Sequence, residues 1–245
     1  MRLLARGYFV FAYFFSLLLF GLFGLALNLI CALLLVLPRH TRFGPAARRA
    51  IRALFSAWVK WLHFCGAIRV TWRGFDAPLP AGVIYTANHP TLIDATLLLA
   101  RLPNAICIFK PALLRNPAIA ASARLAGYIA GDAGIDLIHD AADRVLHGCS
   151  LLIFPEGTRT NVGSLLNPLK PGFALVAERA AAPIQIITIR TAQHLVPKGW
   201  PWWRVPRLPG RVEINLGERI LPTGRSASEL STAVENRLRA ALADR

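Results

Sequence analysis

The chain has 245 residues, of which 55% are hydrophobic, and its lysines and arginines give it a formal net charge of +15. This length suffices for one good-sized domain with a membrane segment, and it is marginal for two independent domains. The hydrophobic fraction is high for a soluble protein. The basic balance predicts polyanionic partners, which are either nucleic acid or anionic lipid headgroups and phosphorylated substrates.

Residues 8–37 contain no charged side chain. About 20 apolar residues at a rise of 1.5 Å each cross a bilayer, so this stretch fits one tilted helix or a re-entrant pair bent near Gly21 and Gly24. The apolar core of a signal peptide is shorter, at about 7–15 residues. A membrane-embedded helix or helical hairpin favours lipid over nucleic acid as the polyanionic partner, and the sequence contains no known nucleic-acid-binding motif.

Arginines on both sides of the apolar segment indicate its orientation. Arg2 and Arg6 precede it, and a larger number follow. The following arginines are Arg39, Arg42, Arg48, Arg49 and Arg52. The positive-inside rule therefore places the residues after Leu37 in the cytoplasm, and a re-entrant hairpin would place both ends there.

Residues 46–65 mix arginines with tryptophans and aliphatic side chains at helical spacing. This pattern suits an amphipathic helix at a bilayer interface, although an ordinary core-facing helix with a solvated basic side shows it too. We therefore predict an N-terminal membrane segment with an interfacial helix over residues 1–66 and a second domain over residues 67–245.

After Gly66, short apolar runs alternate with helical patterns, which predicts an α/β fold with a mixed sheet flanked by helices. The predicted strands cover residues 68–72, 83–86, 105–109, 151–154, 184–189 and 212–216. The predicted helices cover residues 92–101, 111–126, 141–147, 173–181 and 226–243. Residues 200–210 are rich in Trp, Pro and Arg and form either a surface loop lying on lipid or an irregular connection.

The four cysteines are scattered without metal-binding spacing, so we expect buried free thiols and a reducing compartment. These residues are Cys31, Cys65, Cys107 and Cys149.

The first candidate site is the run Asn88-His89-Pro90-Thr91-Leu92-Ile93-Asp94, which follows a predicted strand and opens a predicted helix. The spacing lets the Asp94 carboxylate reach the His89 imidazole. A histidine held in this way has one nitrogen fixed as a donor and the other free as a base. On spacing alone, a capping histidine beside a solvated aspartate is the commoner arrangement, because such pairs are frequent at helix starts.

The second candidate site is Phe154-Pro155-Glu156-Gly157-Thr158-Arg159, directly after a predicted strand. Functional groups gather at the carboxyl ends of strands in open α/β sheets. Gly157 permits a close backbone approach, Thr158 and Arg159 can donate to phosphate oxygens, and Glu156 can orient the arginine or the loop. A simple turn with a surface ion pair has the same composition.

Together, the two runs resemble the glycerolipid acyltransferases, a family that includes 1-acylglycerol-3-phosphate acyltransferase. The resemblance covers roughly residues 81–189. It implies that His89 is the general base, that Asp94 orients it, and that the Glu156–Arg159 element binds the acceptor phosphate. Lys170, in Lys170-Pro171-Gly172, matches a family lysine and is a further candidate for phosphate contact. The expected substrate-binding set is Asn88, Thr91, Glu156, Gly157, Thr158, Arg159 and Lys170.

The resemblance implies a membrane-bound acyltransferase that uses acyl-CoA or acyl carrier protein as donor and a lysophospholipid as acceptor. The expected location is the inner membrane of a bacterium, with the catalytic domain facing the cytoplasm and bound to anionic membrane lipids. No metal or organic cofactor is implied. Residues 88–94 are also similar to those of bacterial members in aryl-polyene-like lipid pathways, which leaves a non-glycerophosphate acceptor as an alternative.

The sequence departs from the family pattern at Ala133, where members that use glycerol phosphate often carry arginine, so one arm of a phosphate clamp is missing. Three rivals to acyl transfer stay open. A hydrolase lacks the expected Gly-x-Ser-x-Gly elbow. A metal-dependent phosphoesterase lacks further ligands near His89 and Asp94. A non-catalytic basic membrane adaptor would not depend on His89.

Overall fold

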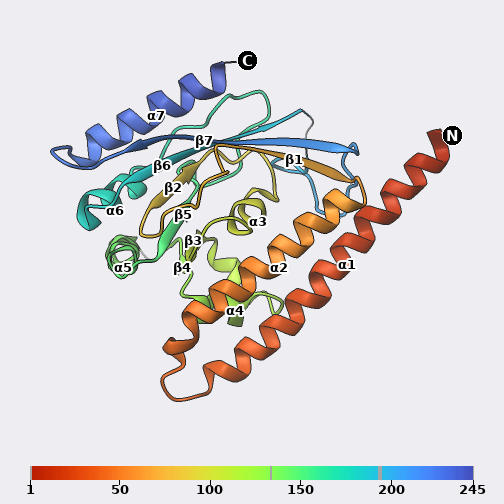
Figure 1. Ribbon diagram of the computed structural model, residues 1–245, viewed down its shortest axis with the longest axis horizontal. Coiled ribbons are helices and arrows are strands. Elements are labelled where there is room, and N and C mark those ends of the chain that lie inside the picture. The colour runs from red at the N-terminus through yellow and green to blue at the C-terminus, as the bar shows by residue number, and fades with distance from the viewer. Residues whose placement is uncertain (1, 133, 193–194, 245) are drawn as a thin grey trace.

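The computed structural model describes residues 2–132, 134–192 and 195–244, and a seven-stranded sheet forms its centre (Figure 1). The strand order is β1-β7-β6-β2-β5-β3-β4. All neighbouring strands run parallel except β6 and β7, which are antiparallel, so the sheet is mixed as predicted. The strands are β1 (Ile68–Arg73), β2 (Ile84–Ala87), β3 (Ala105–Phe109), β4 (Ile129–Ala130), β5 (Ser150–Ile153), β6 (Ile184–Thr191) and β7 (Gly210–Ile220).

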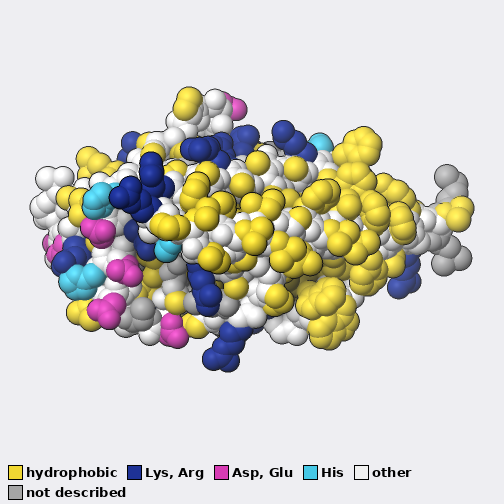
Figure 2. Space-filling view, turned by 90° about the horizontal axis from the view of Figure 1, so that it is seen from below, with side chains coloured by type: hydrophobic (Ala, Val, Ile, Leu, Met, Phe, Trp, Pro, Cys, Tyr) yellow, Lys and Arg dark blue, Asp and Glu magenta, His cyan; other side chains and the backbone are white. Residues whose placement is uncertain are grey.

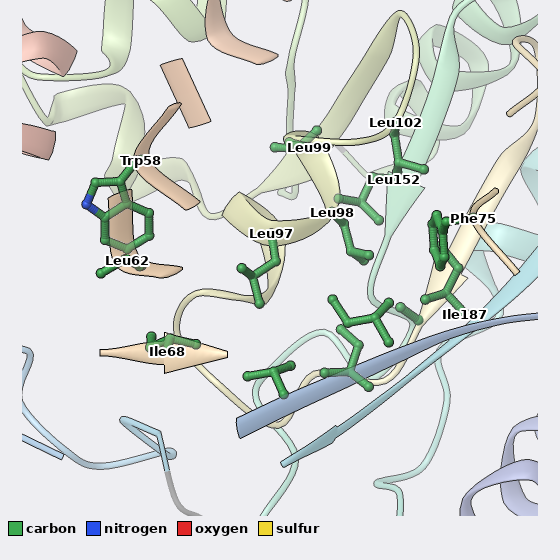
Figure 3. Close-up of a cluster of buried hydrophobic side chains, with 14 of the residues drawn as sticks. Trp58, Leu62, Ile68, Phe75, Leu97, Leu98, Leu99, Leu102, Leu152 and Ile187 are labelled. Carbon is green, nitrogen blue, oxygen red and sulfur yellow. The ribbon is translucent and has the colours of Figure 1, made fainter. Parts of the chain in front are cut away.

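Helices cover both faces of the sheet, which makes a three-layer α/β arrangement (Figure 1). One face carries α2 (Gly44–Phe64) and α3 (Asp94–Leu99), and the other carries α5 (Gly134–Leu146), α6 (Gly172–Ala180) and α7 (Ala227–Ala243). Each face has its own apolar core, because successive side chains of a strand point to opposite sides. Figure 3 shows the first core, in which the leucines of α3 lie between Trp58 and Leu62 of α2 on one side and Ile187 of the sheet on the other.

The N-terminal segment is a helical hairpin made of α1 (Arg2–Leu35) and α2, joined through the short 3-10 helix η1 (His40–Phe43). Helix α1 runs unbroken through Gly21 and Gly24, so the predicted alternative of a bend at these glycines is wrong. Among the described residues, α1 is the one helix long and apolar enough to cross a membrane, over Leu4–Leu35.

One side of α1 packs on the rest of the protein, and the other side is exposed. The buried positions are Ala12, Ser16, Asn28 and Cys31. Ser16 accepts hydrogen bonds from two α2 indoles: Trp58 Nε1 donates to its carbonyl at 2.9 Å and Trp61 Nε1 to its Oγ at 3.0 Å. These tryptophans therefore point at α1, and the hairpin shares the core of the sheet.

Two predicted helices differ from the observed ones, and one observed strand was not predicted. The helix expected over residues 111–126 is split into the 3-10 helix η2 (Pro111–Arg115) and α4 (Ala120–Ala126). Pro117 explains the break, because a proline disfavours the helical region for the preceding residue, and Asn116 is extended with ψ 115°. The helix expected over residues 141–147 begins earlier, as α5, and the two-residue strand β4 was too short to predict. The four cysteines are free and buried, as expected.

Candidate active site

His89 and Asp94 meet at the carboxyl end of β2, where the chain leaves the sheet and enters α3. His89 Nδ1 lies 2.8 Å from Asp94 Oδ2, with the carboxyl fully buried and the imidazole 19% exposed. Thr91 secures the same carboxylate, because its backbone N–H donates to Oδ2 at 2.7 Å and its Oγ1 donates to Oδ1 at 2.5 Å. Asp94 thus holds Nδ1, and Nε2 is the ring nitrogen left for an external proton.

Asn88 fixes the start of this loop to the neighbouring strand. Its side-chain Nδ2 donates to the Ile189 carbonyl at 2.9 Å, and the Ile189 N–H donates back to Asn88 Oδ1 at 2.7 Å. The amide therefore imitates a strand partner at the end of β6. In this structure Asn88 and Thr91 contact protein groups that determine where His89 sits.

Glu156 joins the two candidate runs into one site. Its buried carboxylate accepts from the His89 N–H at 2.9 Å, from Thr160 Oγ1 at 2.7 Å and from the Asn167 N–H at 2.9 Å. The Thr160 N–H in turn donates to the His89 carbonyl at 2.7 Å. The backbone of His89 is consequently held from both sides by the loop after β5.

Phe154 completes the surroundings of the histidine. Its ring stacks on the His89 imidazole at a centroid distance of 4.2 Å and an interplanar angle of 22°. The sequence run included Phe154 but assigned it no role, and Thr160 and Asn167 were missed altogether. The position of Phe154 just before Pro-Glu-Gly could have indicated a role in the site. Thr160 and Asn167, in contrast, look like ordinary polar loop residues in the sequence.

The remaining candidates surround a left-handed turn at Gly157, whose φ is +66°. A Cβ at this position would lie 3.0 Å from Cε and Nζ of Lys170, so the lysine side chain passes directly over the glycine. Thr158 is partly exposed in the same loop. Arg159 behaves differently from expectation, since its Nη1 donates to the backbone carbonyls of Val196 and Pro197, both at 2.8 Å.

A small apolar pocket lies beside this site, between the hairpin and the connection from β6 to β7. Leu92 and Ile93 line it from the His89 loop, Leu17 and Trp58 from the hairpin, and Val196 from the connection. Its free volume is about 50 Å³. Within residues 2–132, 134–192 and 195–244, no three His, Cys, Asp or Glu side chains come together in a way that could hold a metal ion.

Comparison with known proteins agrees with this geometry. The family model described as Acyltransferase matches residues 69–190, which include both candidate runs. A crystal structure of the 1-acyl-sn-glycerophosphate acyltransferase from Thermotoga maritima superposes with a TM-score of 0.75 at 21% identity, covering 99% of this chain and 97% of that one. At this identity the superposition shows a shared fold, including the N-terminal hairpin within the covered length.

Curated relatives point to the same family. A 1-acyl-sn-glycerol-3-phosphate acyltransferase from Cocos nucifera is 34% identical over 119 residues, which are 46% of this chain and 38% of the relative. One from Limnanthes alba is 33% identical over 119 residues, with 46% and 42% covered. The matched region thus spans less than half the length of these relatives. The family model described as Acyltransferase thus matches the part of the chain that carries the His–Asp site, and the whole chain shares its fold with a solved acyltransferase.

Proposed function

We propose that the protein is a membrane-associated O-acyltransferase that transfers a fatty acyl group from a thioester donor to a hydroxyl of a lysophospholipid such as 1-acyl-sn-glycerol-3-phosphate. The observation that carries this proposal is the His89–Asp94 pair, in which a buried, hydrogen-bonded carboxylate holds Nδ1 of a partly exposed imidazole. Such a pair makes Nε2 a general base. The curated relatives are acyltransferases of that acceptor.

The reaction needs no protein nucleophile when both substrates bind together. His89 Nε2 accepts the proton of the acceptor hydroxyl while the hydroxyl oxygen attacks the thioester carbonyl carbon. The new C–O bond forms, the C–S bond breaks, and the leaving thiolate recovers the proton from the imidazolium. Asp94 stabilises the charged imidazole during this sequence, and Phe154 keeps the ring from turning.

The acceptor phosphate is assigned to the turn that contains Gly157. Lys170 is exposed beside this turn and supplies a positive charge. Arg159 has Nη1 engaged by the carbonyls of Val196 and Pro197, so its phosphate contact would come from Nε and Nη2. Ala133, the expected departure from the family's phosphate clamp, lies outside the described residues. The acceptor panel below distinguishes a glycerophosphate acceptor from one of a specialised lipid pathway.

The acyl chain is assigned to the apolar pocket beside Leu92 and Ile93. Its 50 Å³ is far below the roughly 300–1,000 Å³ of ordinary ligand sites, so binding requires the pocket walls to separate. One wall is formed by Leu17 of α1, whose outer face is exposed and apolar. Lipid contact along α1 would therefore place the acyl site at the edge of the bilayer.

The exposed face of α1 supports association with a membrane. Figure 2 shows hydrophobic side chains gathered along the hairpin, with lysines and arginines at the margins. Arg49 and Arg52 of α2 are exposed and suit anionic lipid headgroups. We assign the protein to the inner membrane of a bacterium, with the sheet on the cytoplasmic side, because the arginine-rich stretch follows α1.

The test is acyl transfer by the full chain in mixed micelles of detergent and lipid. Labelled acyl-CoA and acyl carrier protein are offered against a panel of lysophospholipids and non-phosphorylated hydroxylated lipids. Transfer to 1-acylglycerol-3-phosphate is the expected result. Transfer to a different acceptor alone would retain the chemistry and revise the substrate, whereas release of free fatty acid without transfer to any acceptor would contradict the proposal.

A further inference from the structure

The connection from β6 to β7 exposes aromatic side chains that no part of the described protein covers. We call residues 195–209 the strap. Trp202 is 55% exposed and Trp203 is 60% exposed, with their rings 5.6 Å apart in an edge-to-face arrangement. Two adjacent exposed indoles are costly in water, because each ring buries a large apolar area when it finds a partner.

The strap that carries the two indoles is fixed to the rest of the protein by hydrogen bonds at three places. Arg159 Nη1 donates to the carbonyls of Val196 and Pro197. Lys198 Nζ donates to Asn161 Oδ1 at 3.0 Å. Tyr13 of α1 donates its hydroxyl to the carbonyl of Trp202.

Backbone strain at the start of the strap strengthens this argument. Val196 has a φ of +48°, a left-handed conformation that is rare and unfavourable for a β-branched residue. The Arg159 hydrogen bonds help hold this conformation, and Leu195 and Val196 are both buried. The fold therefore retains an unfavourable backbone conformation that fixes the outer part of the strap in one position.

The charge of the strap fits an anionic surface. Lys198, Arg204 and Arg207 lie in it, and residues 195–209 contain no aspartate or glutamate. The Arg204 guanidinium lies over the Trp200 ring at 4.0 Å from its centroid, which pairs a cation with an aromatic face. Tryptophan beside arginine is the composition that proteins place at the level of lipid headgroups.

The strap is also continuous with the apolar face of α1. Tyr13, which binds the strap, lies between Phe11 and Phe14, and these two side chains are 65% and 42% exposed. A bilayer that covers this part of α1 reaches Trp202 as well. Lipid is thus the occupant that the charge, the indoles and the neighbouring surface favour together.

We propose that the strap is a second membrane contact, which inserts Trp202 and Trp203 at the headgroup level next to α1. This inference rests on the membrane placement in the proposed function. It gives Arg159 a further role as a positioning residue, because Arg159 connects the loop of the active site to the lipid-bound strap.

The test measures the depth of spin labels in the full chain reconstituted in vesicles of phosphatidylcholine with phosphatidylglycerol as the minor component. A nitroxide is attached to Trp203→Cys, and its collisions with lipid-soluble oxygen are compared with those of a water-soluble nickel complex. The native thiols do not compete, because all four are buried and burial raises the pKa of the Cys107 thiol to about 12. Unlabelled wild-type protein checks this point.

Two further sites serve as matched controls of similar exposure. Leu18→Cys reports the outer face of α1, which is 55% exposed there, and Leu221→Cys reports the turn between β7 and α7, which is 58% exposed. We expect the ratio of oxygen to nickel accessibility at position 203 to exceed that at position 221 several-fold and to approach that at position 18.

Water-like accessibility at position 203 with a lipid-like result at position 18 would overturn the strap contact and leave the membrane placement intact. Water-like results at all three sites would overturn both. A label at position 203 that only added acyl carrier protein shields would identify a protein-docking surface and overturn the lipid assignment. Acyl transfer measured in the same vesicles reports on the proposed reaction independently of these outcomes.

Discussion

Asn88, Thr91 and Glu156 bind other parts of the protein around His89. The sequence predicted that these side chains touch substrate. In the structure Asn88 pairs with Ile189, Thr91 with Asp94, and Glu156 with the His89 N–H. Their polar atoms are buried, so removing one partner leaves another unpaired. We therefore expect substitutions here to act through the position of the imidazole.

Gly157 provides a prediction at this scale, with Gly163 as its control. Both have positive φ values, of +66° and +86°, so alanine at either position costs roughly 1–2 kcal/mol of folding free energy. Only at Gly157 would the added Cβ meet Lys170. Gly157→Ala should therefore lower acyl transfer well beyond Gly163→Ala, with a similar loss of thermal stability.

Steady-state transfer rates and melting temperatures of both variants in the same detergent check this. Equal activity of the two variants would show that the position of Lys170 over the turn has no part in the reaction.

The individual helices show where a sequence pattern was sufficient to predict a helix and where it was not. The long apolar run of α1 and the amphipathic pattern of α2 were read correctly as helices, because each repeats over many turns. Helices α4 and α5 were misplaced, since an alanine-rich stretch hides the break at Pro117 and a glycine at position 134 resembles a turn. Local patterns of this length do not determine where an element begins.

Asn28 gives the prediction for the contact between α1 and α4. It is a buried amide in the apolar helix α1, where its Oδ1 accepts from the Ser122 N–H at 2.9 Å and its Nδ2 donates to the Pro117 carbonyl. The first turn of α4 has no cap from its own preceding residue, so Asn28 supplies one from another helix. Asn28→Leu should lower the free energy of unfolding by about 1–3 kcal/mol.

Thermal unfolding of the detergent-solubilised protein measures this effect. Leu29→Ala is the control, because Leu29 is adjacent and exposed, and it should change the melting temperature little. A melting temperature unaltered by Asn28→Leu would mean that the two helices are held by apolar packing alone.

At the scale of the whole molecule, the hairpin of α1 and α2 packs against the α/β domain and contributes side chains to its apolar core. Ala12 of α1 and Trp58 of α2 belong to the same core as the strands, and Cys31 packs with Ala121 of α4. Deleting residues 1–39 would uncover this core and leave the Trp58 and Trp61 indoles without their acceptors at Ser16. We predict that the shortened chain aggregates, as judged by size-exclusion chromatography.

A folded, active and monomeric shortened chain would instead make α1 a detachable anchor. Full-length protein carried through the same purification is the control for losses caused by handling.

The sheet and the His89–Asp94 pair were predictable because strand spacing and a short motif are local in sequence. The hydrogen-bond network around this pair was not predictable from the sequence. Glu156 lies 67 positions from His89, and Val196 lies 37 positions from Arg159. Such contacts depend on which strands become neighbours, and β2, β5 and β6 are adjacent only in the folded sheet.

The central claim is that His89 is the base of an acyl transfer, and one comparison of rates tests it. His147 is a control of the same type, since its Nδ1 lies 3.5 Å from Asp143 Oδ1 in an exposed pair at the end of α5. His89→Ala should reduce the rate of transfer by at least about 100-fold, and His147→Ala should leave it unchanged. Transfer by folded His89→Ala protein at the unmodified rate would contradict the account.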